Sequence, residues 1–127
     1  MAKDDFIAQL QARGYNVREP FPGFIVIDYK IDIGSFIGEV VQLGFCRIDS
    51  FPDIPPGGPN FNRHLKPFNN TIRTHPDGGI HYSKNAFPDI GMGNEWQYWS
   101  RPFPAWEKTD RSVDTYFAHL RHLLDTI

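Results

Sequence analysis

The segment from residue 38 to residue 61 constrains the fold more than any other part of the chain. Residues 39–48 are rich in valine, leucine, phenylalanine and isoleucine and show no helical period, which predicts a strand with apolar residues on both faces. The second half combines prolines with adjacent glycines: Pro52, Pro55, Pro56, Pro59, Gly57 and Gly58. Because proline has no backbone N–H, we expect this half to leave the sheet as a rigid loop. The sequence therefore predicts an architectural corner, packed by the side chains of Phe51 and Phe61.

The size and composition of the chain predict one globular domain, residues 1–127. A chain of 127 residues can bury a core of its own, and 40% hydrophobic with 22% charged residues is typical of globular proteins. The formal net charge of -2, without a basic stripe, argues against nucleic-acid binding. No apolar run approaches the roughly 18 residues that cross a bilayer, so we expect no membrane partner. Residues 1–14 do not resemble a signal peptide and the single cysteine, Cys46, excludes an internal disulfide, which predicts a cytoplasmic protein.

The N-terminal third predicts a helix followed by an antiparallel meander. Asp4 and Asp5 precede an apolar pattern that stops at Gly14, as expected for a short capped helix. The expected strands are residues 15–18, 24–27 and 39–48, and residues 29–33 fit either a further half-buried strand or the continuation of 24–27. The predicted fold class is therefore α+β, with an N-terminal helix, a four-stranded antiparallel meander, the proline-rich corner and a C-terminal helix.

The C-terminal third predicts aromatic packing and then the last helix. Three tryptophans, Trp96, Trp99 and Trp106, supply large surfaces that can seal an open sheet edge, and we interpret them as core and lid packing. Asp110 and Ser112 are suited to the N-cap of the helix that follows. Its apolar residues recur at steps of four and three and form one stripe: Val113, Phe117, Leu120, Leu124 and Ile127.

The densest polar cluster lies in residues 62–93, which lack periodicity and are rich in turn-forming residues. His81, Ser83 and Asn85 alternate, so an extended backbone would place all three on one side. A serine hydroxyl becomes a nucleophile when a histidine takes its proton, and an asparagine can donate to a developing oxyanion. The alternative is a polar loop whose side chains satisfy its own turns, and the spacing alone leaves both interpretations open.

Two other chemistries are weaker candidates. His64, His75 and His81 with Asp77 are ligand types that zinc accepts, but the sequence has no HExxH motif and no closely spaced ligand pair, so we expect neither a metal nor a cofactor. Cys46 stands among apolar residues of the predicted strand, where a cysteine usually acts as an inert small hydrophobe. We therefore expect it to be structural.

The order of these features resembles the ubiquitin-conjugating (UBC) fold. Residues 51–56, Phe-Pro-Asp-Ile-Pro-Pro, are similar to the "YP..PP" segment of that family, and His75-Pro76-Asp77 is similar to the His-Pro-Asn that precedes its active site. The C-terminal block resembles the prokaryotic family E branch, which has a Trp-Gln-x-Trp-Ser-Arg segment, a further tryptophan and an Asp-x-x-x-x-His-Leu helix. The matching residues here are 96–101, Trp106, Asp114, His119 and Leu120.

The resemblance implies a bacterial conjugation pathway with a ubiquitin-like protein, an activating enzyme and a deconjugating protease as partners. Family enzymes carry the ubiquitin-like protein as a thioester on a cysteine soon after the His-Pro-Asn, yet residues 78–83 contain no cysteine, and Asp77 lacks the amide donor. Two functions are compatible with this departure. The first is a transferase that carries the acyl group on oxygen, most plausibly on Ser83 with His81 or His75 as base. The second is an inactive UBC-like module that binds the ubiquitin-like protein or scaffolds the activating enzyme.

Overall fold

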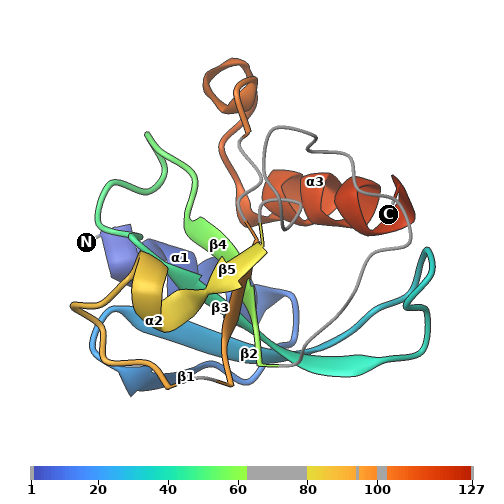
Figure 1. Cartoon of the computed structure of the whole chain (residues 1–127). Helices are drawn as coiled ribbons and strands as arrows, with labels where there is room; N and C mark the ends of the chain where they lie inside the picture. Colours follow the sequence, from blue (N-terminus) through green and yellow to red (C-terminus); the bar gives the residue numbers. More distant parts are fainter. Residues whose placement is uncertain (1, 63–79, 94, 100–102, 127) are drawn as a thin grey trace.

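The computed structural model describes residues 2–62, 80–93, 95–99 and 103–126, and their fold class is α+β (Figure 1). The helices are α1 (Ala2–Ala12), α2 (Ser83–Ala86), the 3-10 helix η1 (Trp106–Lys108) and α3 (Val113–Thr126). The strands are β1 (Arg18–Phe21), β2 (Phe24–Lys30), β3 (Val40–Cys46), β4 (Gly57–Phe61), β5 (Ile80–Tyr82) and β6 (Gln97–Trp99). Of these described helices, none is long and apolar enough to cross a membrane.

The described strands form one antiparallel sheet in the order β1-β2-β3-β4-β6-β5. The predicted antiparallel meander is confirmed for β1, β2 and β3, but the sheet continues beyond β3 through β4 and β6 to β5 at its edge. The predicted strand at residues 15–18 is displaced, because the tight turn between Phe21 and Phe24 sets the pairing of β1 with β2. Of the two alternatives for residues 29–33, the continuation of the preceding strand is correct as far as Lys30, where β2 ends.

The expectation that residues 57–61 leave the sheet is wrong, because they form β4 between β3 and β6. The ladder pairs Gly44 with Asn60 and Cys46 with Gly57, and its register shifts between those two pairs. Pro59 falls within this irregularity, where the ladder does not need the N–H that proline lacks. The corner itself is shorter than predicted and ends before Gly57, while Phe51 and Phe61 are both buried as expected.

The larger core lies between one face of the sheet and the helices α1 and α3. β2 and β3 place alternate side chains on this face: Ile25, Ile27, Tyr29, Val41, Leu43 and Phe45. Phe6 of α1 packs edge-on against Phe45 with ring centroids 5.0 Å apart, and Phe117 of α3 lies 6.3 Å from the same ring. The apolar stripe of the last helix is confirmed for its described members, and Ile127 lies outside the described residues.

The ends of the two long helices follow from their capping residues. Gly14 has a φ of 91° and its N–H donates to Gln11 O, which confirms it as the stop of α1. The helix begins at Ala2, so Asp4 and Asp5 lie in its first turn rather than at the cap. At the start of α3, Ser112 Oγ accepts from the N–H of Thr115, as predicted for an N-cap.

The opposite face of the sheet carries a smaller core. Its buried residues are Phe24, Val26, Cys46, Phe87, Met92 and Trp96. Residues 83–93, which comprise α2 and the loop after it, cover this face, and we call them the strap; Figure 1 shows α2 in front of the strands and α1 behind them. Trp96 packs edge-on against Phe24 at 4.9 Å, and Trp99 and Trp106 are buried in the larger core, so the prediction that the tryptophans pack is confirmed.

Candidate functional site

Ser83 lies where β5 meets α2, and its side chain is completely buried. Its N–H donates to Trp96 O at 3.0 Å, and its carbonyl accepts from the N–H of Phe87 at 2.8 Å. Its Oγ donates to Asn60 Oδ1 at 2.8 Å. The hydroxyl and the N–H of this serine therefore hold the strap to the sheet region, while its carbonyl closes the first turn of the strap itself.

The expectation that His81, Ser83 and Asn85 share one side of an extended chain is wrong. The backbone is extended only as far as Tyr82 and is helical from Ser83, so the two-residue alternation stops there. His81 is exposed on β5, with its ring 6.3 Å from the ring of Tyr98, and Asn85 is exposed on α2. The structure brings neither of them to the hydroxyl of Ser83 by a hydrogen bond between described residues.

The remaining predicted site residues, His75 and Asp77, lie outside the described residues, as does His64. Within the described part of the chain, no group of three His, Cys, Asp or Glu side chains is arranged to hold a metal ion.

Asn60 is the polar centre of the site, and sequence reasoning missed it. This fully buried side chain accepts from Ser83 and donates through Nδ2 to Gly44 O at 3.2 Å. Nδ2 also lies 3.6 Å from Sγ of Cys46, whose thiol donates to Gly57 O at 3.5 Å. The sequence signal that could have found it is an asparagine directly before Phe61 in an otherwise apolar and proline-rich segment. An asparagine that is buried in such a segment must find hydrogen-bond partners inside the protein.

Cys46 is buried and close to this network. Burial raises the pKa of its thiol to about 12, and the contact with Asn60 and the positive charge of Arg47 oppose that rise only in part. The thiol is therefore neutral at physiological pH, whereas a nucleophilic cysteine reacts as the thiolate.

The chemistry available to Ser83 follows from its hydrogen-bond partner. An amide oxygen accepts a hydrogen bond but does not take up a proton as an imidazole does. The hydroxyl is thus fixed as a donor inside the protein, with no solvent-exposed surface for an acyl donor to reach. In this conformation the network positions the chain and does not activate a nucleophile.

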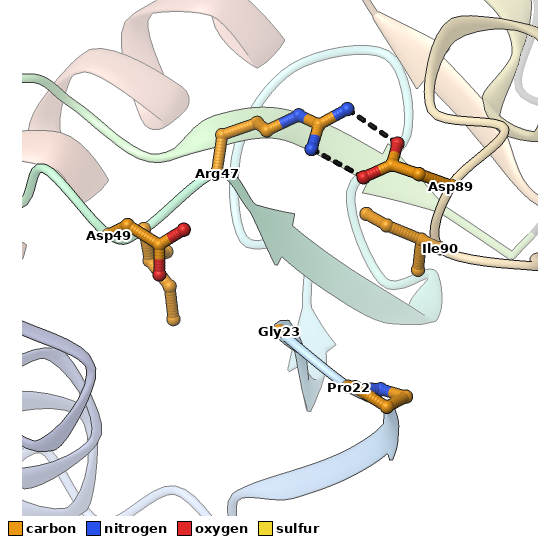
Figure 2. Close-up of a pocket in the computed structure, with 7 residues that line it drawn as sticks. Pro22, Gly23, Arg47, Asp49, Asp89 and Ile90 are labelled. Carbon is orange, nitrogen blue, oxygen red and sulfur yellow. Dashed lines mark hydrogen bonds and ion pairs between the residues drawn. The ribbon is translucent and has the colours of Figure 1, made fainter.

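A second polar feature, which was not predicted from the sequence, borders the strap. Arg47 binds Asp89 through two hydrogen bonds of 2.8 and 2.6 Å, which hold the pKa of the Asp89 carboxyl below its usual value (Figure 2). A cavity of about 140 Å³ lies beside this pair. It is lined by Pro22, Gly23, Arg47, Ile48, Asp49, Asp89 and Ile90.

Arg47 and Asp89 are 42 positions apart in the sequence, so no local pattern connects them. The backbone of Arg47 has a φ of 53°, a left-handed conformation that is uncommon for residues other than glycine. Its guanidinium carbon also lies 5.3 Å from the centre of the Phe87 ring. The side chain therefore touches the strap at two points.

A scan against protein-family models finds no match to this chain, and comparisons with curated proteins and with solved structures find no similar protein either.

Proposed function

We propose that this chain is a ubiquitin-conjugating-enzyme-like protein of a bacterial ubiquitin-like protein conjugation pathway, and that it acts there as a binding module. The observation that carries the second part is the state of Ser83, whose buried hydroxyl donates to Asn60 Oδ1. A hydroxyl in this state is out of reach of a second protein, and its hydrogen bond goes to an amide oxygen rather than to a base. Cys46 offers no substitute, because its thiol is buried and neutral.

Contacts between the segments that carry the sequence resemblance support the first part of the proposal. Trp106 belongs to the tryptophan block and Pro52 belongs to the proline corner. The indole Nε1 of Trp106 donates to Pro52 O at 2.7 Å, and its ring lies 6.2 Å from that of Phe51. Trp106 thus packs against the proline corner, as expected if both motifs belong to a single family architecture.

The partners of this function are a ubiquitin-like protein and an activating enzyme, with a deconjugating protease in the same pathway and the cytoplasm as the compartment. The module would bind the ubiquitin-like protein or hold the activating enzyme, without forming a covalent intermediate of its own.

The competing proposal is a ubiquitin-like protein transferase that carries the acyl group on Ser83, with His81 or His75 as the base. It is favoured by the position of Ser83, which follows directly after the exposed residues His81 and Tyr82 of β5. It requires the strap to release Ser83 from Asn60 before any reaction takes place.

The experiment that tests the binding proposal uses a ubiquitin-like protein and an activating enzyme from the same genome. Each is titrated into the folded protein in isothermal calorimetry without ATP, so that no activated acyl group exists. The proposal predicts saturable binding of at least one partner, by wild type and by Ser83→Ala alike. An absence of binding to both partners would contradict it.

A further inference from the structure

The strap is attached to the sheet by a few contacts at defined places. At its first residue, Ser83 is held by Asn60 and by Trp96 O. In its middle, the ring of Phe87 packs edge-on against Tyr98 with centroids 4.8 Å apart, and Met92 completes the small core. Beneath these side chains lies Cys46, which has no exposed surface.

The outer part of the strap is attached differently, by charge. Arg47 donates to Asp89 through its two terminal guanidinium nitrogens, and the same guanidinium lies over Phe87. The cavity of about 140 Å³ separates this part of the strap from Pro22 and Gly23 of the β1–β2 turn, as Figure 2 shows. Side-chain packing is therefore incomplete beside this part of the strap. The ion pair joins the strap to Arg47, the residue that follows β3.

The two cores differ in size among the described residues. Twenty buried residues form the core beneath α1 and α3, whereas six form the core beneath the strap. Release of the strap would expose only the smaller core, so it requires less free energy than unfolding the sheet.

We propose that the Arg47–Asp89 pair is a latch that holds the strap over the second face of the sheet, and that local release of the strap exposes Cys46 and Ser83. The left-handed backbone of Arg47 supports this assignment, because strained residues persist where surrounding contacts over-determine them and they cluster at switch regions. The inference goes beyond the proposed function and does not rest on it, since strap release is a property of this chain alone.

The latch controls access to the second face of the sheet. While it is closed, the side chains of Cys46 and Ser83 are buried. A partner that competes for either charge of the pair would favour the open state, because a ligand shifts an equilibrium toward the state it binds better.

The test uses Cys46 as a reporter, because the chain has no other cysteine. The folded protein is incubated with iodoacetamide at pH 8 and low salt, and intact-mass spectrometry gives the labelling rate. Asp89→Asn removes the charge of the latch, and we expect labelling about two- to fivefold faster, the change expected from losing one partly exposed ion pair. Salt at 1 M should speed wild type similarly and leave Asp89→Asn nearly unchanged.

Two further variants separate the latch from general destabilisation. Asp32→Asn removes an ion pair of matched exposure, since the side chains of Arg121 and Asp32 are 49% and 59% exposed and those of Arg47 and Asp89 are 51% and 59% exposed. This variant should label at the wild-type rate. Reversing both charges, Arg47→Asp with Asp89→Arg, should restore slow labelling. The labelling rate should also rise only weakly with urea below the unfolding transition, since local release exposes little surface.

Equal rates for wild type and Asp89→Asn would overturn the proposal. So would a urea dependence as steep as that of global unfolding, or an equal acceleration by Asp32→Asn.

Discussion

Ser83 and Asn60 join the strap to the interior of the sheet: the serine Oγ donates to the amide Oδ1 at 2.8 Å, and neither side chain has exposed surface. The same amide donates to Gly44 O, so one buried side chain connects α2, β4 and β3. Because a buried polar group that loses its partner retains its full desolvation penalty, the two residues depend on each other.

Ser83→Ala should lower the free energy of unfolding by about 1–3 kcal/mol, because Asn60 Oδ1 would lose its partner. Asn60→Leu should destabilise as well, since it leaves the hydroxyl and Gly44 O without their bonds. The double variant should lose less than the sum of the single losses, which urea titration of all four proteins measures. Strict additivity would show that the two residues are not energetically coupled.

Trp99→Ala should cost about 3–5 kcal/mol of unfolding free energy, because the indole is fully buried and packs edge-on against Phe61 at 5.3 Å. Ile37→Ala is the control, since Ile37 is 66% exposed and should change stability by less than about 0.5 kcal/mol. A loss below about 1 kcal/mol for Trp99→Ala, measured by denaturant titration, would mean that the tryptophan is not a packing residue.

Gly44→Ala tests how closely the second face is packed. A Cβ at this position would lie 2.2 Å from the ring of Phe24, so the ring must move, at a cost of about 1–3 kcal/mol. Combining it with Phe24→Leu should remove most of the additional loss, because the obstructing ring is gone. If Gly44→Ala proved as stable as wild type in urea, the account of this face would be wrong.

The sequence predicted the parts of this fold that have long local patterns. The apolar stripe of α3, the stop at Gly14 and the buried tryptophans follow from spacing and residue type. The three-residue strands β5 and β6 and the four-residue helix α2 are too short to carry a period, and the pairings of the sheet determine them. The presence of Pro59 led to the prediction that β4 is not a strand. The irregularity in the ladder that accommodates this proline is not visible in the sequence.

The candidate site was predicted less well than the fold. Ser83 was identified as chemically notable, but its partner Asn60 lies 23 positions away and was not. The alternation with His81 and Asn85 assumed an extended chain, and one turn of helix changes which side chains face inward. The Arg47–Asp89 pair depends entirely on contacts between distant segments.

Because the thiol of Cys46 is buried, we expect the folded protein to lose stability at high pH. Its pKa is about 12 in the folded protein against 9.0 unfolded, so above pH 9 the unfolded chain releases a proton that the folded protein retains. The stability that the neutral thiol contributes below pH 9 is therefore lost as the pH rises toward 12. At pH 10 the free energy of unfolding should be lower by about 1.4 kcal/mol. Urea titrations at pH 8 and 10 should show this loss in wild type but not in Cys46→Ala, and equal losses would contradict the burial of the thiol.

Cys46→Ser is expected to retain any conjugation activity while lowering stability, because the thiol fills space in the second core. The activity of the folded variant is compared with wild type in the reconstituted pathway. Complete loss of activity in a folded Cys46→Ser protein would revive a thioester mechanism.

Intact-mass spectrometry of this chain, after incubation with its activating enzyme, ubiquitin-like protein and ATP, tests directly whether it carries an acyl group. We expect the chain to keep its unmodified mass, in wild type and in Ser83→Ala, while the activating enzyme itself becomes charged. An adduct of one ubiquitin-like protein that survives reducing thiol, is lost in hydroxide and is absent from folded Ser83→Ala would contradict it, and would identify Ser83 as an oxyester carrier.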